Sequence, residues 1–177
     1  MSKLFLTSSR IEDIIKILPQ VDNIKMAFIP TAADLDEDKW YIESDMNKLK
    51  ELRISFKIVD IKGKNLQKFE EEFNDINTVY IAGGNTFYLL KKSQESSFDT
   101  FIQNFIKNDI LYAGGSAGAV IAGPDISPIA QVDEPEKVPN LQSTIGFSLT
   151  DFIILPHYDN PKYTDIYKEI QIKFTKQ

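Results

Sequence analysis

Short apolar runs alternate along the chain with stretches whose apolar residues recur at every third or fourth position. A short apolar run is typical of a buried strand, and the longer spacing is typical of an amphipathic helix. The predicted strands are Lys3–Leu6, Ile24–Ile29, Ser55–Ile61, Thr78–Ala82, Asp109–Ala113 and Asp151–Leu155. The predicted helices are Arg10–Leu18, Asp36–Leu52, Leu66–Phe73, Thr86–Lys91, Phe98–Lys107 and Tyr163–Phe174.

This alternation predicts an α/β fold, a three-layer αβα sandwich in which a mostly parallel sheet has helices on both faces. Helical spacing over Asp36–Leu52 is carried by Trp40, Met46, Leu49 and Leu52. Pro124–Ser148 contains several prolines and no clean period, which predicts a long irregular loop or a small hairpin excursion. No repeat or linker divides the chain, so we expect residues 1–177 to form a single domain.

Composition narrows the classes of function. The 177 residues carry a net charge of −6, which argues against nucleic-acid or anionic membrane partners. There are no cysteines, which excludes disulfides, thiolate metal sites and a cysteine nucleophile. No apolar run approaches the roughly 18 residues of a membrane span. A cytoplasmic protein is the expectation.

The segment Gly114–Ala119 reads GGSAGA and directly follows the apolar run Asp109–Ala113. A serine among small residues between a strand and a helix is typical of a nucleophile elbow, which lifts the hydroxyl off the end of a sheet. A plain tight turn or a phosphate-binding glycine loop is the alternative. The lysine of a Walker loop and the spacing of a dinucleotide fingerprint are both absent. We therefore predict that Ser116 is a catalytic nucleophile.

His157 is the only histidine and follows the apolar run Asp151–Leu155. The carboxyl ends of parallel strands are where ligands bind in such sheets. A serine hydroxyl needs a base that works near neutral pH, and imidazole is the usual one. A surface loop histidine is the alternative, but Ser116 favours His157 as the base.

Gly83–Thr86 also follows a buried strand and begins a helix. Backbone N–H groups at such a turn can face an oxyanion. We predict that the N–H groups of Gly84 and Ala117 form the oxyanion hole and that Asn85 and Thr86 contact substrate. The alternative is a helix entry with Asn85 as its N-cap, and both can hold at once.

The acid that would orient the histidine is less well defined. Asp133 is the first candidate, and Asp159 and Asp125 are others; each can instead be a solvated surface charge. The acidic residues of Asp34–Asp38 and Glu70–Glu72 are expected to be solvated. One histidine and no cysteine disfavour a transition-metal site, and no metal or other cofactor is expected.

Taken together, these motifs resemble the peptidase E family, the S51 serine peptidases, whose fold is class I glutamine amidotransferase-like, a flavodoxin-like arrangement. The resemblance is carried by Phe28–Ala32, Ile81–Leu90, Gly114–Ala119 and Pro156–Asn160. It implies Ser116 as nucleophile, His157 as base, and Gly84 and Ala117 as oxyanion donors. It also implies that Asp133 is the family's loop aspartate.

Two departures from the family pattern bear on activity. Members continue past the histidine and its helix with strands that hold a glutamate proposed for the triad. The chain ends at Gln177, so we expect it to lack that region and that glutamate. In the family's aspartyl dipeptidases, an arginine just after the histidine binds the substrate's aspartate; here Lys162 and Lys168 are the candidates to replace it, but an ammonium lacks the bidentate fork of a guanidinium. A strict preference for an N-terminal aspartate is therefore not expected.

These observations predict a serine exopeptidase that hydrolyses short peptides, some of them aspartyl dipeptides, through an acyl-enzyme on Ser116. It would need no cofactor and would be a monomer or a homodimer. The alternatives are a catalytically weak or inactive binding protein of the same fold, and a cyanophycinase-like hydrolase.

Overall fold

The computed structural model describes residues 3–17 and 23–174 and contains a five-stranded sheet with the strand order β1-β5-β4-β2-β3. Every neighbouring pair in this sheet is parallel. The strands are β1 (Lys3–Thr7), β2 (Lys25–Ile29), β3 (Ser55–Ile58), β4 (Thr78–Ile81) and β5 (Leu111–Gly115).

Helices connect the strands. The α-helices are α1 (Trp40–Glu51), α2 (Leu66–Phe73), α3 (Thr86–Ser96), α4 (Phe98–Phe105), α5 (Ala117–Val120) and α6 (Thr164–Phe174). Short 3₁₀ helices are η1 (Ile11–Lys16), η2 (Thr31–Leu35), η3 (Ile106–Asn108), η4 (Ser127–Gln131), η5 (Pro135–Lys137) and η6 (Pro161–Tyr163).

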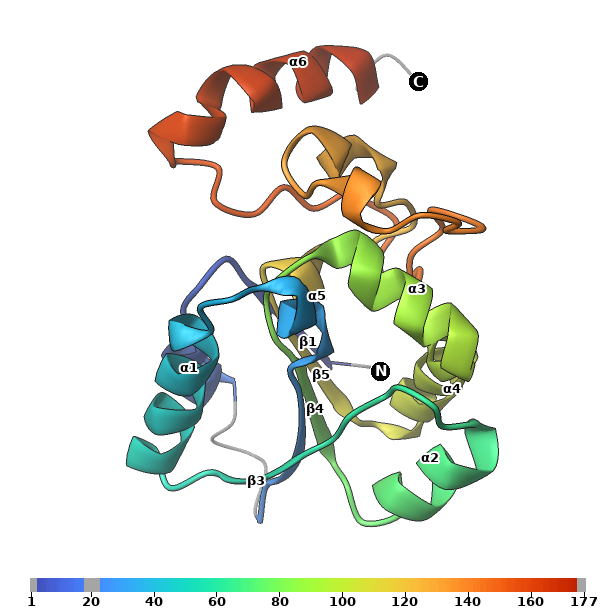
Figure 1. The fold of residues 1–177 in the computed structure, drawn as a ribbon. Helices are drawn as coiled ribbons and strands as arrows, with labels where there is room; N and C mark the ends of the chain where they lie inside the picture. The colour runs from blue at the N-terminus through green and yellow to red at the C-terminus, as the bar shows by residue number, and fades with distance from the viewer. Residues whose placement is uncertain (1–2, 18–22, 175–177) are drawn as a thin grey trace.

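The sheet is covered on both faces, which explains why its central strands are apolar throughout. Along β2, Met26 and Phe28 face the core beneath η1 and α1, whereas Ala27 and Ile29 face the core beneath α2, α3 and α4. Figure 1 shows α1 on one side of the sheet and α2, α3 and α4 on the other. Helix α6 lies beyond the end of the sheet at which α5 begins (Figure 1). The predicted three-layer αβα sandwich is confirmed.

Aromatic packing dominates the core on the side of α2 and α4. Phe98 is fully buried, and its ring lies 5.1 Å from that of Phe69, 5.9 Å from Phe101 and 6.1 Å from Phe147. Because Phe147 belongs to the long segment 124–148, this cluster fixes that segment to the helical layer.

The first two helices of the sequence-based prediction differ from those in the structure. Arg10–Leu18 contains only the 3₁₀ helix η1, and its last residue lies outside the described residues. The helix predicted from Asp36 begins at Trp40, whose N–H donates to the Asp38 carboxylate at 3.1 Å. Trp40 is also 67% exposed, although it shares the helical apolar spacing.

The strand predicted at Asp151–Leu155 is wrong. The backbone just before it bonds to the turn after α5, with Leu149 N–H donating to the carbonyl of Ala122 at 2.8 Å. Ile154 and Leu155 pack against the core as partly buried side chains without pairing in the sheet. This apolar segment is therefore buried without being a strand. A short apolar run in the sequence does not show which of the two will occur.

Segment 124–148 is the irregular excursion that its prolines predict. It holds η4 and η5 and closes with one antiparallel bridge between Asp125 and Ile145.

The variant Phe98→Ala should lower the free energy of unfolding by about 3–5 kcal/mol, because it removes the buried ring on which four other phenylalanines pack. Urea denaturation measures this change. Ile172→Ala, at a 62% exposed position on α6, is the control and should stay within about 0.5 kcal/mol. Equal losses in the two variants would contradict this account of the core.

Candidate active site

Ser116 occupies the sharp turn between β5 and α5. Its φ of 48° and ψ of −109° lie outside the conformations that side-chain-bearing residues prefer. Such a backbone costs about 1–3 kcal/mol and persists only where the surrounding structure imposes it. The predicted strand-turn-helix context of a nucleophile elbow is therefore present.

Two glycines let this turn pack closely on β4. A Cβ at Gly118 would overlap the carbonyl oxygen of Ile81, and a Cβ at Gly115 would overlap the hydroxyl of Tyr80. Tyr80 is held in turn, because its hydroxyl donates to the carboxylate of Asp45 on α1 at 2.7 Å. The turn can adopt this position only with small residues beside Ser116.

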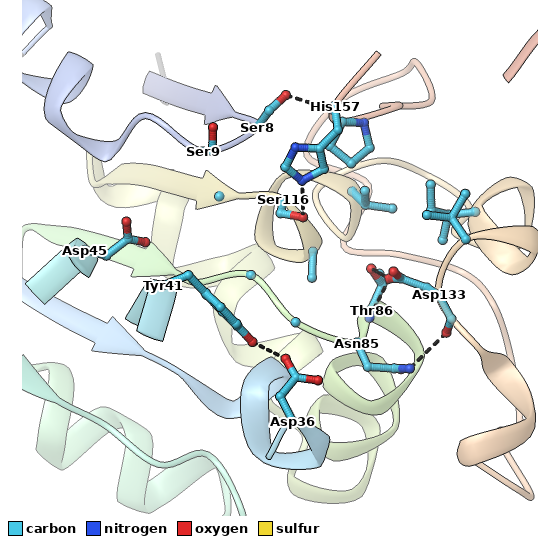
Figure 2. Close-up of a pocket in the computed structure, with 18 of the residues that line it drawn as sticks. Ser8, Ser9, Asp36, Tyr41, Asp45, Asn85, Thr86, Ser116, Asp133 and His157 are labelled. Carbon is cyan, nitrogen blue, oxygen red and sulfur yellow. Dashed lines mark hydrogen bonds between the residues drawn. The ribbon is translucent and has the colours of Figure 1, made fainter. Parts of the chain in front are cut away.

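The structure brings Ser116 and His157 together. Ser116 Oγ lies 3.0 Å from His157 Nε2, within hydrogen-bond reach (Figure 2). The two residues are 41 positions apart in sequence. When Nε2 carries no proton, it can accept the proton of the serine hydroxyl.

Apart from the contact between its ring and Ser116, His157 is held by hydrogen bonds of the backbone. Its N–H donates to Ser8 Oγ at 2.9 Å, just past the end of β1. The preceding carbonyl, of Pro156, accepts the hydroxyl of Tyr167 on α6 at 2.5 Å. Burial lowers the pKa of His157 below its ordinary value, and the charge of Asp133 opposes that shift.

The predicted oxyanion donors, Gly84 and Ala117, line the same cavity as Ser116. Gly84 has a φ of +133°, and a Cβ there would overlap the backbone of Ala32. Within the described residues the Gly84 N–H donates no hydrogen bond. Ala117 is the first residue of α5, where an N–H has no intrahelical acceptor. Both groups are therefore available to a ligand.

Asp133 lies at the start of α3 instead of on the imidazole. Its Oδ2 accepts the N–H of Thr86 at 2.9 Å and also the Thr86 hydroxyl, while its carbonyl accepts Asn85 Nδ2 at 2.9 Å. Burial raises the pKa of Asp133, and the hydrogen bonds from Thr86 act against that rise. Its effect on His157 is through charge, since no hydrogen bond joins the two in the described chain.

Asn85 is the N-cap of α3, as one of the two interpretations predicts, and its Oδ1 accepts the N–H of Tyr88 at 2.8 Å. The other carboxylate candidates do not reach the histidine ring. Asp125 accepts the N–H and hydroxyl of Ser127, and Asp159 is exposed. Across residues 3–17 and 23–174, no carboxylate hydrogen-bonds to His157.

These groups line a cavity of about 530 Å³ at the carboxyl end of the sheet. Its walls include residues that the sequence analysis did not predict to belong to the site, namely Ser8, Leu35, Asp36, Trp40, Tyr41, Asp45 and Tyr80. Asp36 was expected to be solvated, but it accepts a hydrogen bond from the Tyr41 hydroxyl (Figure 2). The sequence did not predict this contact, because a run of acidic residues is more often a solvated helix start.

In the part of the chain that the structure describes, no helix is long and apolar enough to cross a membrane. The same residues contain no cluster of three histidine, aspartate or glutamate side chains arranged to hold a metal ion.

A serine on an elbow, with a histidine within reach at the carboxyl end of a parallel sheet, defines a hydrolase that uses a serine nucleophile. The family comparison agrees, because the profile of Peptidase family S51 matches residues 4–176. The chain belongs to this family and is a serine-type peptidase.

Comparisons with individual relatives support this assignment. An uncharacterized peptidase from Listeria innocua serovar 6a is 33% identical over 99% of this chain and 86% of its own length. A crystal structure of a protein provisionally described as peptidase E from Listeria monocytogenes EGD-e has a TM-score of 0.88 and 32% identity, covering 98% of this chain and 88% of its own. Peptidase E of Nostoc sp. is 29% identical over 77% of this chain and 53% of its own length.

The titration of His157 is predicted to reflect both causes of its pKa shift. Burial should place the pKa below about 6.5, and Asp133→Asn should lower it further by removing the opposing charge. Because the imidazole of the unfolded chain binds a proton more readily than that of the folded chain, the free energy of unfolding should fall as the pH drops through about 6.5.

NMR of the imidazole measures this pKa without ambiguity, since the chain has one histidine. Asp125→Asn is the matched control and should leave the pKa unchanged. A rise in the pKa of His157 in the Asp133→Asn variant would contradict the proposed effect of the Asp133 charge.

Proposed function

We propose that the protein is a serine exopeptidase that hydrolyses short peptides through an acyl-enzyme on Ser116. The observation that carries this proposal is the 3.0 Å contact between Ser116 Oγ and His157 Nε2 inside the cavity. A hydroxyl on a strained turn with an imidazole beside it is a pair that can form and cleave an ester.

The geometry supports a two-step reaction. His157 Nε2 takes the hydroxyl proton while Ser116 Oγ bonds to the scissile carbonyl carbon, and the carbonyl oxygen gains negative charge near the N–H groups of Gly84 and Ala117. The protonated imidazole then gives its proton to the leaving amine as the C–N bond breaks. Water, deprotonated by the same imidazole, cleaves the resulting ester and regenerates the serine.

The size and charge of the cavity support a short substrate with a free amino terminus. About 530 Å³ is within the range of small-molecule sites and holds a few residues of peptide. Asp36 and Asp133 place negative charge on its wall, which favours a protonated α-amino group. The charge of Asp133 also favours the imidazolium that forms at His157 during the reaction.

A catalytically weak or inactive binding protein is the second candidate. One observation favours it: no carboxylate among the described residues orients the imidazole through Nδ1. In the trypsin example, loss of the orienting acid lowers kcat by about 10⁴.

Ser116→Ala is expected to lower the turnover of a dipeptide panel by on the order of 10⁴-fold or more, because it removes the nucleophile. Ser55→Ala, an exposed serine on β3, is the matched control and should retain activity within about twofold. Equal turnover in the Ser116→Ala and Ser55→Ala proteins would refute the nucleophile.

Labelling with a fluorophosphonate separates the two candidates. Stoichiometric modification of Ser116 in the folded protein, abolished in Ser116→Ala, supports the peptidase. A folded protein that is not labelled supports the binding protein.

Peptides with an N-terminal aspartate should be cleaved no faster than their alanine counterparts. Within the described chain no arginine lines the cavity, and its two lysines are paired, Lys48 with Glu12 at 3.0 Å and Lys137 with Glu134 at 2.6 Å. An aspartyl side chain would therefore meet a mostly acidic wall without a free cation. Comparison of kcat/KM for Asp-Leu and Ala-Leu measures this, and a strong preference for Asp-Leu would contradict it.

A further inference from the structure

One part of the cavity rim is apolar and open to solvent. Leu35 is 37% exposed and Trp40 is 67% exposed, and both line the cavity together with the partly buried Tyr41. Trp40 is the only tryptophan in the chain. Large apolar side chains exposed side by side at the mouth of a binding site often mark a contact surface for a ligand.

We propose that Leu35, Trp40 and Tyr41 form the subsite that receives an aromatic or large aliphatic side chain of the peptide, next to the scissile bond. This inference rests on the proposed peptidase function and adds the substrate class that it prefers. The occupant is the substrate because the three side chains line the same cavity as Ser116 and His157.

The subsite is preorganised by local contacts. The N–H of Trp40, at the first position of α1, donates to Asp38, and its ring packs edge-on against Tyr41 with centroids 6.0 Å apart and planes at 89°. The Tyr41 hydroxyl in turn donates to Asp36. Because these contacts orient the two rings before a ligand arrives, less conformational entropy is lost on binding.

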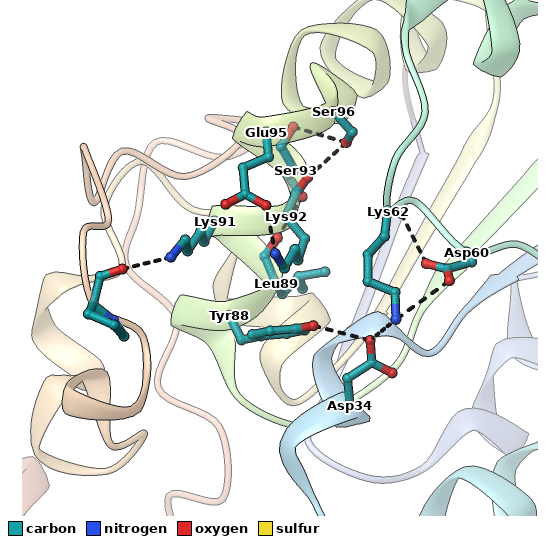
Figure 3. A network of polar contacts seen from close by, with 11 residues as sticks. Asp34, Asp60, Lys62, Tyr88, Leu89, Lys91, Lys92, Ser93, Glu95 and Ser96 are labelled. Carbon is teal, nitrogen blue, oxygen red and sulfur yellow. Dashed lines mark hydrogen bonds and ion pairs between the residues drawn. The ribbon is translucent and has the colours of Figure 1, made fainter.

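A second network holds the rim against the catalytic side of the cavity. Asp34, the neighbour of Leu35, accepts from Lys62 and from the hydroxyl of Tyr88 on α3 (Figure 3). Lys62 also lies 3.5 Å from Asp60. The start of α3 carries Thr86, which binds Asp133, so the same helix supports both the rim and the acidic wall.

The acidic wall and the apolar rim of the cavity differ in chemistry, and this difference determines which peptides we expect the site to prefer. Asp36 and Asp133 favour the amino group of a peptide, whereas the faces of Trp40 and Tyr41 offer dispersion contacts to a side chain. A glycine or alanine residue would leave the tryptophan exposed. A phenylalanine or leucine residue would cover it.

The test compares kcat/KM for Phe-Ala and Ala-Phe, each relative to Ala-Ala. Trp40→Ala should lower at least one of these two ratios by about tenfold, the lower end of the discrimination that an apolar pocket supplies. Trp40→Phe should retain most of that ratio. Ile58→Ala, a 60% exposed position on the edge strand β3 and outside the cavity, is the matched control and should change neither ratio.

Fluorescence provides a readout that does not depend on turnover. In the Ser116→Ala protein, which keeps Trp40, Phe-Ala or Ala-Phe should shift the tryptophan emission to shorter wavelength in a saturable manner, and Ala-Ala should shift it much less. Unchanged ratios in Trp40→Ala would overturn the subsite. If no peptide is cleaved, the emission shift decides: its presence supports the subsite while the peptidase proposal fails, and its absence overturns the subsite as well.

Discussion

The active site depends on one close approach, the packing of the turn between β5 and α5 against β4. Gly118 lies on the carbonyl of Ile81, and Gly115 lies on the hydroxyl of Tyr80. This contact forces Ser116 into a backbone conformation that costs about 1–3 kcal/mol, and the surrounding buried strands offset that cost. A larger side chain at either glycine would push the turn off the sheet and move the hydroxyl away from His157.

The other half of the site depends on segments outside the sheet. His157 follows a stretch that packs on the core without pairing, and Ser8 and the α6 residue Tyr167 fix its backbone. The excursion 124–148 returns Asp133 to the start of α3, where Thr86 binds it. The nucleophile is thus held by strand packing, and the base and the acidic wall are held by hydrogen bonds between loops and helix ends. The two parts meet only because both lie at the carboxyl edge of one parallel sheet.

Much of this arrangement is predictable from local pattern. The central strands are fully apolar because both of their faces are covered, and glycines after β4 and β5 mark the two turns that flank the nucleophile. Other features depend on distant partners. Asp151–Leu155 has the composition of a strand, yet its backbone lies beside Gly123, in the turn after α5, and pairs with no strand of the described chain. Trp40 has the spacing of a core residue, yet as the first residue of α1 it lies at the cavity and is exposed.

The sequence by itself determined the α/β class, the elbow serine, the single histidine and the glycines that leave N–H groups free, because each depends on residue type and spacing over a few positions. The tertiary structure decided the partner of each carboxylate. Asp133 accepts hydrogen bonds from Thr86 at the start of α3 and acts on His157 through its charge, and Asp36 accepts a hydrogen bond from Tyr41 at the cavity. The Asp133–Thr86 pairing joins residues 47 positions apart, and the Asp36–Tyr41 pairing, although only five positions apart, forms only because α1 begins between the two residues. Their partners follow from how the chain packs, and a single acidic residue carries no mark of where its carboxylate will lie.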